Sequence, residues 1–296
     1  MRVARYEEND GVARIGVLTE RGIIPLEAAA CSLSMNSEHF ANMESFLSGG
    51  DTARVLAEKA VNAGPKSAVI SLQNVVLRAP VPRPGKIIAV GWNYRDHSAE
   101  AGAKNLPKTP ILFAKFTTSI SGPGDPIVIP PSDPQVDYEA ELAVVIGKKG
   151  KAIAAKNALE HVAGYMPLND VTARAWQLAD RQWVRGKSPD TFCPIGPWLT
   201  TRDEIPDPHA LSICARVNGA TVQNSNTSEM IFRIPELIEF LSAAITLEPG
   251  DIIASGTPEG VGLYRNPPVF LKAGDVVEVE IENLGVLRNP VVASQS

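Results

Sequence analysis

Short runs of β-branched residues, each closed by Gly, Pro or Asn, recur along most of this chain of 296 residues. They lie at residues 87–91, 126–130, 141–147, 213–219, 251–256 and 276–285. Three of the runs follow similar turns, Pro123-Gly124-Asp125, Pro249-Gly250-Asp251 and Ala273-Gly274-Asp275. Val and Ile favour strands, whereas Gly, Pro and Asp favour tight turns. The pattern therefore predicts a fold of many short strands rather than a bundle of long helices.

Helical segments are fewer and do not alternate regularly with these runs. We expect helices at about residues 96–101, 171–181 and 234–244, the last with Pro235 in its first turn. Because strands and long helices do not alternate, a doubly wound sheet and a (β/α)₈ barrel are disfavoured. The sequence thus predicts an α+β fold that is predominantly β.

The N-terminal stretch is expected to form a small α/β module. Two β-like runs are joined there by Asn9-Asp10-Gly11, which indicates a hairpin because Gly tolerates positive φ. Residues 37–63 are compatible with a helix that is interrupted at Gly49-Gly50. These elements predict a unit of its own ahead of the strand-rich region.

A proline-rich connector follows this module. Pro residues hold their preceding neighbours in extended geometry, and the connector contains Pro80, Pro82 and Pro84. We place the domain boundary there, so that residues 1–78 form a small N-terminal domain and residues 79–296 form one large domain.

Charge and composition exclude several classes of function. Lys and Arg total 28 against 33 Asp and Glu, a net charge of −5, and no basic cluster typical of a nucleic-acid binder occurs. No apolar run approaches the roughly 20 residues of a membrane helix, and the N-terminus lacks the apolar core of a signal peptide. The three cysteines are far apart, which is typical of free thiols in a reducing compartment. We expect a cytoplasmic protein with neither nucleic-acid nor membrane partners.

An acidic pair lies at the start of one predicted strand. Glu139 and Glu141 share one face of an extended segment, with Cα atoms about 6.7 Å apart. Two carboxylates at that separation can bind one hard cation such as Mg²⁺. A solvated acidic face is the alternative, and the alternating residues Glu278, Glu280 and Glu282 are an example that we interpret as surface. Glu141 differs because it leads directly into an apolar run.

A second polar group follows the run that ends near residue 168. Asp170 is expected to cap the N-terminus of a helix, with Arg174 and Gln177 at positions i+4 and i+7 on the same face. An acid, a guanidinium and an amide on one face can bind a cation together with a carboxylate substrate. An ordinary helix cap with one ion pair is the alternative.

Three further positions carry groups suited to catalysis. His97 and Glu100 lie one helical turn apart, so the carboxylate can orient the imidazole as a base, although a surface His–Glu pair is the alternative. Lys187 follows a glycine and precedes a turn, where it is either a fixed cation or a solvated lysine. Thr257 lies in the glycine-rich loop 255–262, whose N–H groups and hydroxyl can bind a carboxylate.

These segments also occur in a specific order. They read NYRDHSAE (93–100), DYEAEL (137–142), NDVTAR (169–174), RGKSPDTFCPIGP (185–197) and TLEPGDIIASGTPEGVG (246–262). In this order they closely resemble the fumarylacetoacetate hydrolase family, over about residues 80–292. The resemblance implies a mixed β-roll or barrel-like catalytic domain behind a small N-terminal module, and a homodimer.

The resemblance also implies the roles of the site residues. It assigns a divalent cation, Mg²⁺ or else Mn²⁺ or Ca²⁺, to Glu139, Glu141 and Asp170. It makes His97, Glu100 and Lys187 catalytic, and it places Arg174, Gln177 and Thr257 against the substrate. Two departures from the family pattern, Pro189 and Ala175-Trp176, lie near this pocket and bear on the identity of the substrate.

The implied reaction is hydrolysis of a carbon–carbon bond. A 2,4-dioxo acid, either an acylpyruvate or a diketo-deoxy sugar acid, is cleaved to pyruvate and a carboxylic acid by water that His97 and Glu100 activate. An oxaloacetate-type decarboxylase, or a keto–enol or double-bond isomerase, is the alternative on the same metal site. A non-catalytic, metal-stabilised protein is a third reading, which the joint presence of ligands, dyad and lysine disfavours.

Overall fold

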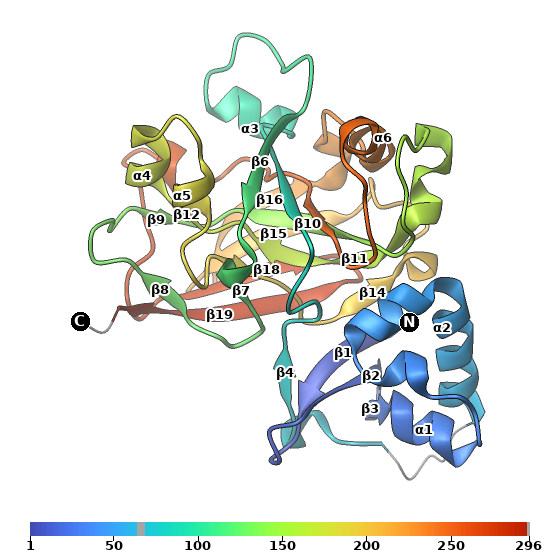
Figure 1. Ribbon diagram of the computed structural model, residues 1–296. Coiled ribbons are helices and arrows are strands. Elements are labelled where there is room, and N and C mark those ends of the chain that lie inside the picture. Colours follow the sequence, from blue (N-terminus) through green and yellow to red (C-terminus); the bar gives the residue numbers. More distant parts are fainter. Residues whose placement is uncertain (64–68, 295–296) are drawn as a thin grey trace.

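A computed structural model describes residues 1–63 and 69–294 (Figure 1). The larger sheet has ten strands, mostly antiparallel. Its order is β3 (Gly22–Pro25), β2 (Ala13–Thr19), β1 (Arg2–Glu7), β14 (Leu199–Thr201), β11 (Val162–Asn169), β10 (Ala140–Ile146), β17 (Ile252–Ala254), β5 (Ile87–Gly91) and β6 (Ile111–Lys115), with β4 (Val76–Arg78) also paired to β1. Strands β17 and β5 pair in parallel.

A second sheet has five strands and packs beside the first. Its order is β16 (Ala220–Asn226), β15 (Ser212–Val217), β18 (Val276–Ile281), β19 (Gly285–Ala293) and β8 (Ile127–Ile129). Two short pairs complete the described strands, β12 (Thr172–Ala173) with β9 (Val136–Asp137) and β13 (Cys193–Pro194) with β7 (Ile120–Ser121). The predicted α+β, predominantly β fold is confirmed, and the described strands form open sheets rather than a closed barrel.

The helices are short apart from α2. They are α1 (Leu26–Ser32), α2 (Met43–Ala63), α3 (Arg95–Glu100), α4 (Arg174–Ala179), α5 (Val184–Lys187) and α6 (Ile234–Ala244). Single 3₁₀ turns lie at Glu38–Phe40, Leu72–Asn74, Thr117–Ser119, Ala155–His161, Arg202–Glu204, Thr227–Glu229 and Gly262–Tyr264. None of the helices in the described part of the chain is both long and apolar enough to cross a membrane.

Several local predictions can be compared with these elements. The first hairpin forms as expected, and α6 has the predicted bounds. Helix α2 kinks at Gly50, whose φ of 53° and ψ of −135° are not helical, as the glycine pair indicated. The helix expected from residue 171 is wrong at its start, because Thr172 and Ala173 pair with β9 and α4 begins only at Arg174.

The N-terminal module continues the large sheet. Strand β1 pairs with β14 through Arg2 opposite Thr200 and Val3 opposite Leu199. Its helices α1 and α2 lie together at one side of the molecule (Figure 1). Because one hydrophobic core contains residues from both sides of the expected boundary, the module packs on the large domain as part of its structure. The division at residue 78 stays a prediction.

Strand β10 is the centre of the molecule. All seven of its residues are buried, because the strand has a hydrophobic core against each of its faces. Leu142 and Val144 belong to one core, whereas Ala143 and Val145 belong to the other. The N-terminal end of this central strand carries the candidate site.

Candidate active site and metal centre

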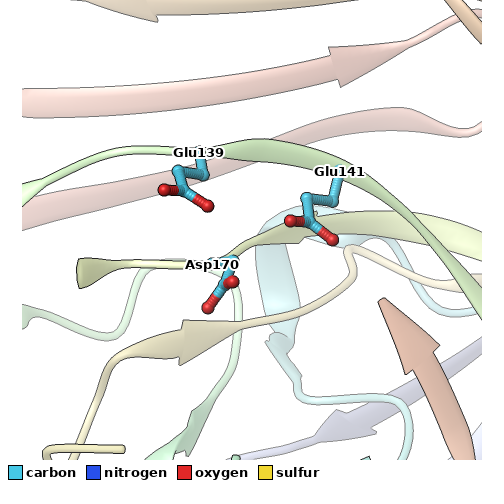
Figure 2. A group of neighbouring side chains, drawn as sticks. All are labelled: Glu139, Glu141 and Asp170. Atoms are coloured by element: carbon cyan, nitrogen blue, oxygen red, sulfur yellow. The ribbon is translucent and has the colours of Figure 1, made fainter. Parts of the chain in front are cut away.

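The pairing of β10 with β11 brings the three predicted carboxylates together. Ala140 lies opposite Asn169, so Glu139, just before β10, meets Asp170, just after β11. The Asp170 N–H donates to the Glu139 carbonyl over 2.8 Å. Glu139, Glu141 and Asp170 each offer one oxygen within 4.8 Å of the others, and the three carboxylates face one another (Figure 2). All three residues are buried, unlike the partly exposed Glu278 and Glu280, which pair with Arg216 on β15.

Asp170 reaches this cluster by a route that differs from the prediction. The expected helix cap at Asp170 is wrong, because the residue before α4 is Ala173. Asp170 instead directly follows the long strand β11 and is completely buried. The strand pairing, not the dipole of a helix, therefore places its carboxylate.

Two buried lysines contact Asp170. Lys187, at the end of α5, donates from Nζ to Glu139 Oε2 and Asp170 Oδ2, both over 2.7 Å. Lys115, at the end of β6, donates to Asp170 Oδ1 over 2.6 Å and also to the Lys187 carbonyl. Lys187 therefore lies inside the cluster even though Pro189, a departure from the family pattern, follows two residues later. Sequence reasoning missed Lys115, although a lysine closing the apolar run ILFA was an available signal.

Arg174 connects the cluster to a fourth carboxylate. Its Nη2 lies 2.7 Å from both Asp137 Oδ2 and Glu139 Oε1, and its Nη1 donates to Gln177 Oε1 over 2.9 Å. Burial alone would lower the pKa of Arg174, but Asp137 and Glu139 raise it, so the guanidinium stays charged. Asp137, which we did not predict as a site residue, also accepts from the Gly262 N–H over 2.7 Å.

The two glutamates of the cluster have opposite electrostatic environments. Burial opposes ionisation of Glu139, yet the charges of Lys187 and Arg174 lower its pKa to about 2. For Glu141, burial and then the charges of Asp170 and Glu139 raise the pKa well above its usual value. Glu141 accepts a hydrogen bond from the Gly256 N–H over 2.8 Å and has no ion pair with any described residue.

The donor set fits a hard divalent cation. Three buried carboxylates each place one oxygen within 4.8 Å of the others. Glu141 has no ion pair with the described residues to neutralise its charge, and burial together with the neighbouring carboxylates raises its pKa. Oxygen ligands of this kind suit Mg²⁺, Mn²⁺ or Ca²⁺, with the remaining positions open to water or substrate. Glu139, Glu141 and Asp170 would hold such an ion.

The predicted His–Glu pair forms on α3. His97 Nδ1 lies 3.2 Å from Glu100 Oε2, and both side chains are largely buried. The other Glu100 oxygen accepts from the Gly260 N–H over 2.9 Å, so the glycine-rich loop fixes the carboxylate. With Nδ1 engaged by Glu100, the imidazole has Nε2 for proton exchange.

The glycine-rich loop binds carboxylates, but they are the chain's own. Its N–H groups donate to Glu141, Glu100 and Asp137, as described above. The Thr257 side chain is held by Gln223, whose Nε2 donates to Thr257 Oγ1 over 2.9 Å. Because Thr257 accepts that bond, its own hydroxyl proton is available to a ligand.

A cavity of about 90 Å³ joins these groups. Most of the predicted site residues line it, namely His97, Glu139, Glu141, Arg174, Gln177, Lys187 and Thr257. Four aromatic side chains complete much of the wall, Trp92, Phe113, Trp183 and Tyr264. The cavity thus places an imidazole, cations and two carboxylates around one small space, whereas Glu100 and Asp170 are not among its lining residues.

We expect Lys115→Met to weaken both the fold and the cation site. The substitution removes one of the two ammonium groups that contact the buried Asp170, and because Lys187 remains, we expect a loss of about 3 kcal/mol of unfolding free energy, the low end for a broken buried ion pair. Urea unfolding measures this, and Mg²⁺ titration of the same variant should show weaker binding because Asp170 loses its support. Lys104→Met, at an exposed lysine, is the control and should change stability by less than about 0.5 kcal/mol. Equal stability of the two variants would contradict the assigned role of Lys115.

Comparison of the sequence with known proteins finds one family model and several curated relatives. The family model described as fumarylacetoacetate (FAA) hydrolase, C-terminal, matches residues 86–292. The chain is 48% identical to a Xenopus laevis protein named oxaloacetate tautomerase fahd2, mitochondrial, over 99% of this chain and 90% of that protein.

Solved structures give the same result. A fumarylacetoacetate hydrolase from Exiguobacterium antarcticum superposes with a TM-score of 0.84 at 38% identity, covering 99% of this chain and 100% of that one. Maleylpyruvate hydrolase from Sphingobium sp. SYK-6, solved with manganese(II) and pyruvate, gives a TM-score of 0.80 at 33% identity, covering 100% of each chain. The order of motifs, the fold and these matches agree, and the chain belongs to the fumarylacetoacetate hydrolase family.

Proposed function

We propose that this protein is a divalent-metal-dependent keto–enol tautomerase of a short 2-oxo diacid of the oxaloacetate type. The observation that carries the proposal is that His97, which contacts Glu100, lines one small cavity together with Glu139 and Glu141, two of the three clustered carboxylates. Tautomerisation needs one proton transfer at carbon and one at oxygen, with no attacking water. The 48% identity with a protein named oxaloacetate tautomerase supports this choice over hydrolysis.

The chain's own residues account for the proton transfers. When the enol becomes the ketone, the proton of the C2 hydroxyl passes to solvent water and a proton from His97 Nε2 is added at C3, after which His97 regains a proton from solvent. His97 exchanges the C3 proton through Nε2, and Glu100 holds the imidazole in the tautomer and orientation that this requires. Lys187 uses two of its N–H donors on Glu139 and Asp170 and has a third for the developing negative charge on the C2 oxygen.

The remaining groups bind and orient the substrate. Glu139, Glu141 and Asp170 would hold a divalent cation, which would supply positive charge beside the bound 2-oxo acid. The Thr257 hydroxyl and the Gln177 amide nitrogen, which donates to no other group among the described residues, are donors for a substrate carboxylate. The small cavity favours a short substrate over a bulky one.

Hydrolysis of a 2,4-dioxo acid, which the sequence predicted first, is the second candidate. The structural likeness to maleylpyruvate hydrolase favours it, since that protein was solved with manganese(II) and pyruvate. In this reaction His97 removes a proton from water, and the water attacks the C4 carbonyl. The two candidates share the site and differ in whether the C3–C4 bond breaks.

The test is to follow the enol absorbance of oxaloacetate after mixing with protein and Mg²⁺. We expect the protein to accelerate loss of the enol signal, and we expect EDTA to abolish the acceleration. Acylpyruvates are assayed in parallel for pyruvate release. Faster cleavage of an acylpyruvate than ketonisation of oxaloacetate would overturn the proposal in favour of the hydrolase.

Three further features stay as proposals. Mg²⁺ is the proposed metal, because carboxylate and water ligands suit it. A homodimer and a cytoplasmic location are also proposed, from the family resemblance and the sparse cysteines, although the Xenopus laevis relative is named as mitochondrial.

A further inference from the structure

Trp92 has a backbone conformation that a bulky residue rarely adopts. Its φ is 59°, in the left-handed region that favours glycine and, among other residues, Asn and Asp. The residue directly follows β5 and lines the cavity. Such conformations persist only where the surrounding structure enforces them, and they cluster at ligand sites.

The neighbours of Trp92 show how the conformation is enforced. Asn93 donates from Nδ2 to the carbonyls of Ser255 and Phe232, over 2.7 and 3.0 Å, and accepts from the Phe232 N–H over 2.8 Å. On the other side, a Cβ at Gly91 would lie 2.5 Å from the ring of Trp183. The backbone is therefore held on both sides of Trp92, by hydrogen bonds of Asn93 and by the close approach of Trp183 to Gly91.

The indole of Trp92 lies beside the imidazole of the acid–base pair. The ring centroids of Trp92 and His97 are 5.4 Å apart, and those of Trp92 and Tyr264 are 6.4 Å apart. His97 and Tyr264 are 5.8 Å apart, so the three rings contact one another around the imidazole. All three line the cavity that also contains Glu139 and Lys187.

We propose that Trp92 is a specificity-determining residue that limits the length of the substituent on C3 of the 2-oxo acid. This rests on the proposed function in one respect, that the 2-oxo acid head lies at the carboxylate cluster and C3 lies at His97. Any atoms beyond C3 must then pass the imidazole and meet the indole and Tyr264. A short substituent fits there, whereas a longer chain is excluded.

The test is binding of a chain-length series to the Mg²⁺-loaded protein by calorimetry. The probes are 2-oxobutanoate, 2-oxohexanoate and 2-oxooctanoate, which keep the same head and carry uncharged tails. For the unmodified protein we expect affinity for 2-oxooctanoate to be at least tenfold weaker than for 2-oxobutanoate. In Trp92→Gly this ratio should fall below threefold, with 2-oxobutanoate affinity changed less than that of 2-oxooctanoate.

Two more variants separate this role from a structural one. Trp92→Asn suits the left-handed backbone, so it should fold and show the same loss of length selectivity. Trp92→Phe keeps a ring and should retain most of the selectivity. An unchanged ratio in both Trp92→Gly and Trp92→Asn would overturn the proposal. Binding needs no turnover, so failure of the tautomerase assay would overturn the proposed function without deciding this result.

Discussion

The His97→Asn variant is expected to lose about 10² to 10⁴ in kcat for tautomerisation of oxaloacetate, because general acid–base catalysis by one positioned residue contributes that factor. Asn has a similar size to the inner part of the imidazole and keeps a hydrogen-bonding group toward Glu100, but it cannot exchange a proton at neutral pH. KM should change much less than kcat, because Lys187 and the cation site at the three carboxylates, which we propose as the substrate-binding groups, are unchanged.

Two further variants test whether the loss of kcat is specific to the His97–Glu100 pair. Glu100→Gln should lower kcat by a smaller factor, because the imidazole remains but loses the carboxylate that orients it. His161→Asn is the matched control, since His161 contacts the Lys148 carbonyl and lies outside the cavity. Wild-type kcat in His97→Asn, or equal losses in His97→Asn and His161→Asn, would contradict the assigned role of His97.

The second large effect concerns the stability of the metal-free protein. We expect Glu139→Gln and Glu141→Gln to change the free energy of unfolding in opposite directions. Glu139→Gln removes one of the two anionic partners of Lys187 and of Arg174, while Asp170 and Asp137 remain, and we expect a loss of up to about 3 to 5 kcal/mol of unfolding free energy, as for a broken buried ion pair. Glu141→Gln removes a buried carboxylate that has no ion pair with the described residues, so it should leave stability unchanged or raise it at neutral pH. Urea unfolding in EDTA measures both.

The contributions of Glu139 and Glu141 to the free energy of unfolding depend on pH in opposite directions. The pKa of Glu139 falls from 4.5 to about 2, so its contribution is present above pH 4.5 and is lost as the pH falls toward 2. The pKa of Glu141 is raised above 4.5, so ionisation of this group destabilises the fold progressively as the pH rises above 4.5. The advantage of Glu141→Gln should therefore vanish below pH 4.5, whereas the deficit of Glu139→Gln should shrink there.

Addition of Mg²⁺ completes this comparison. The unmodified protein should melt at a higher temperature with Mg²⁺ than in EDTA, because an ion that binds only the folded state stabilises it. Both variants should lose most of that increase, since each removes one carboxylate ligand. A stable Glu139→Gln protein, or a full Mg²⁺ response in Glu141→Gln, would contradict the assignment.

The sequence predicted the strands well because their signals are local. The β-branched run that begins at Glu141 and the helix that begins at Ile234 appear nearly where they were expected. The cap expected at Asp170 failed because local preference for a helix start was overridden by pairing of Thr172 with Asp137, which lies 35 residues earlier in β9. Such long-range pairing has no local signature.

The site was predicted only in part, for a similar reason. Spacing made Glu139 and Glu141 candidates beside the alternative of a solvated acidic face, and helical separation did the same for His97 and Glu100, while the family resemblance supplied their roles. Lys115 had only its position at the end of an apolar run as a signal, and Asp137 had no signal of its own, because the role of each depends on a partner that the fold supplies, Asp170 for Lys115 and Arg174 for Asp137. The strain at Trp92 is likewise invisible in sequence, since it arises from packing of the turn against neighbouring segments.

Proton exchange at C3 of oxaloacetate tests the central claim most directly. In D₂O with Mg²⁺, proton NMR follows deuterium uptake at C3 and formation of pyruvate in the same sample. We predict that the protein accelerates deuterium uptake well above the rate with Mg²⁺ alone, while pyruvate forms no faster than without protein. Exchange at the rate of Mg²⁺ alone, or pyruvate formation that keeps pace with exchange, would contradict the account.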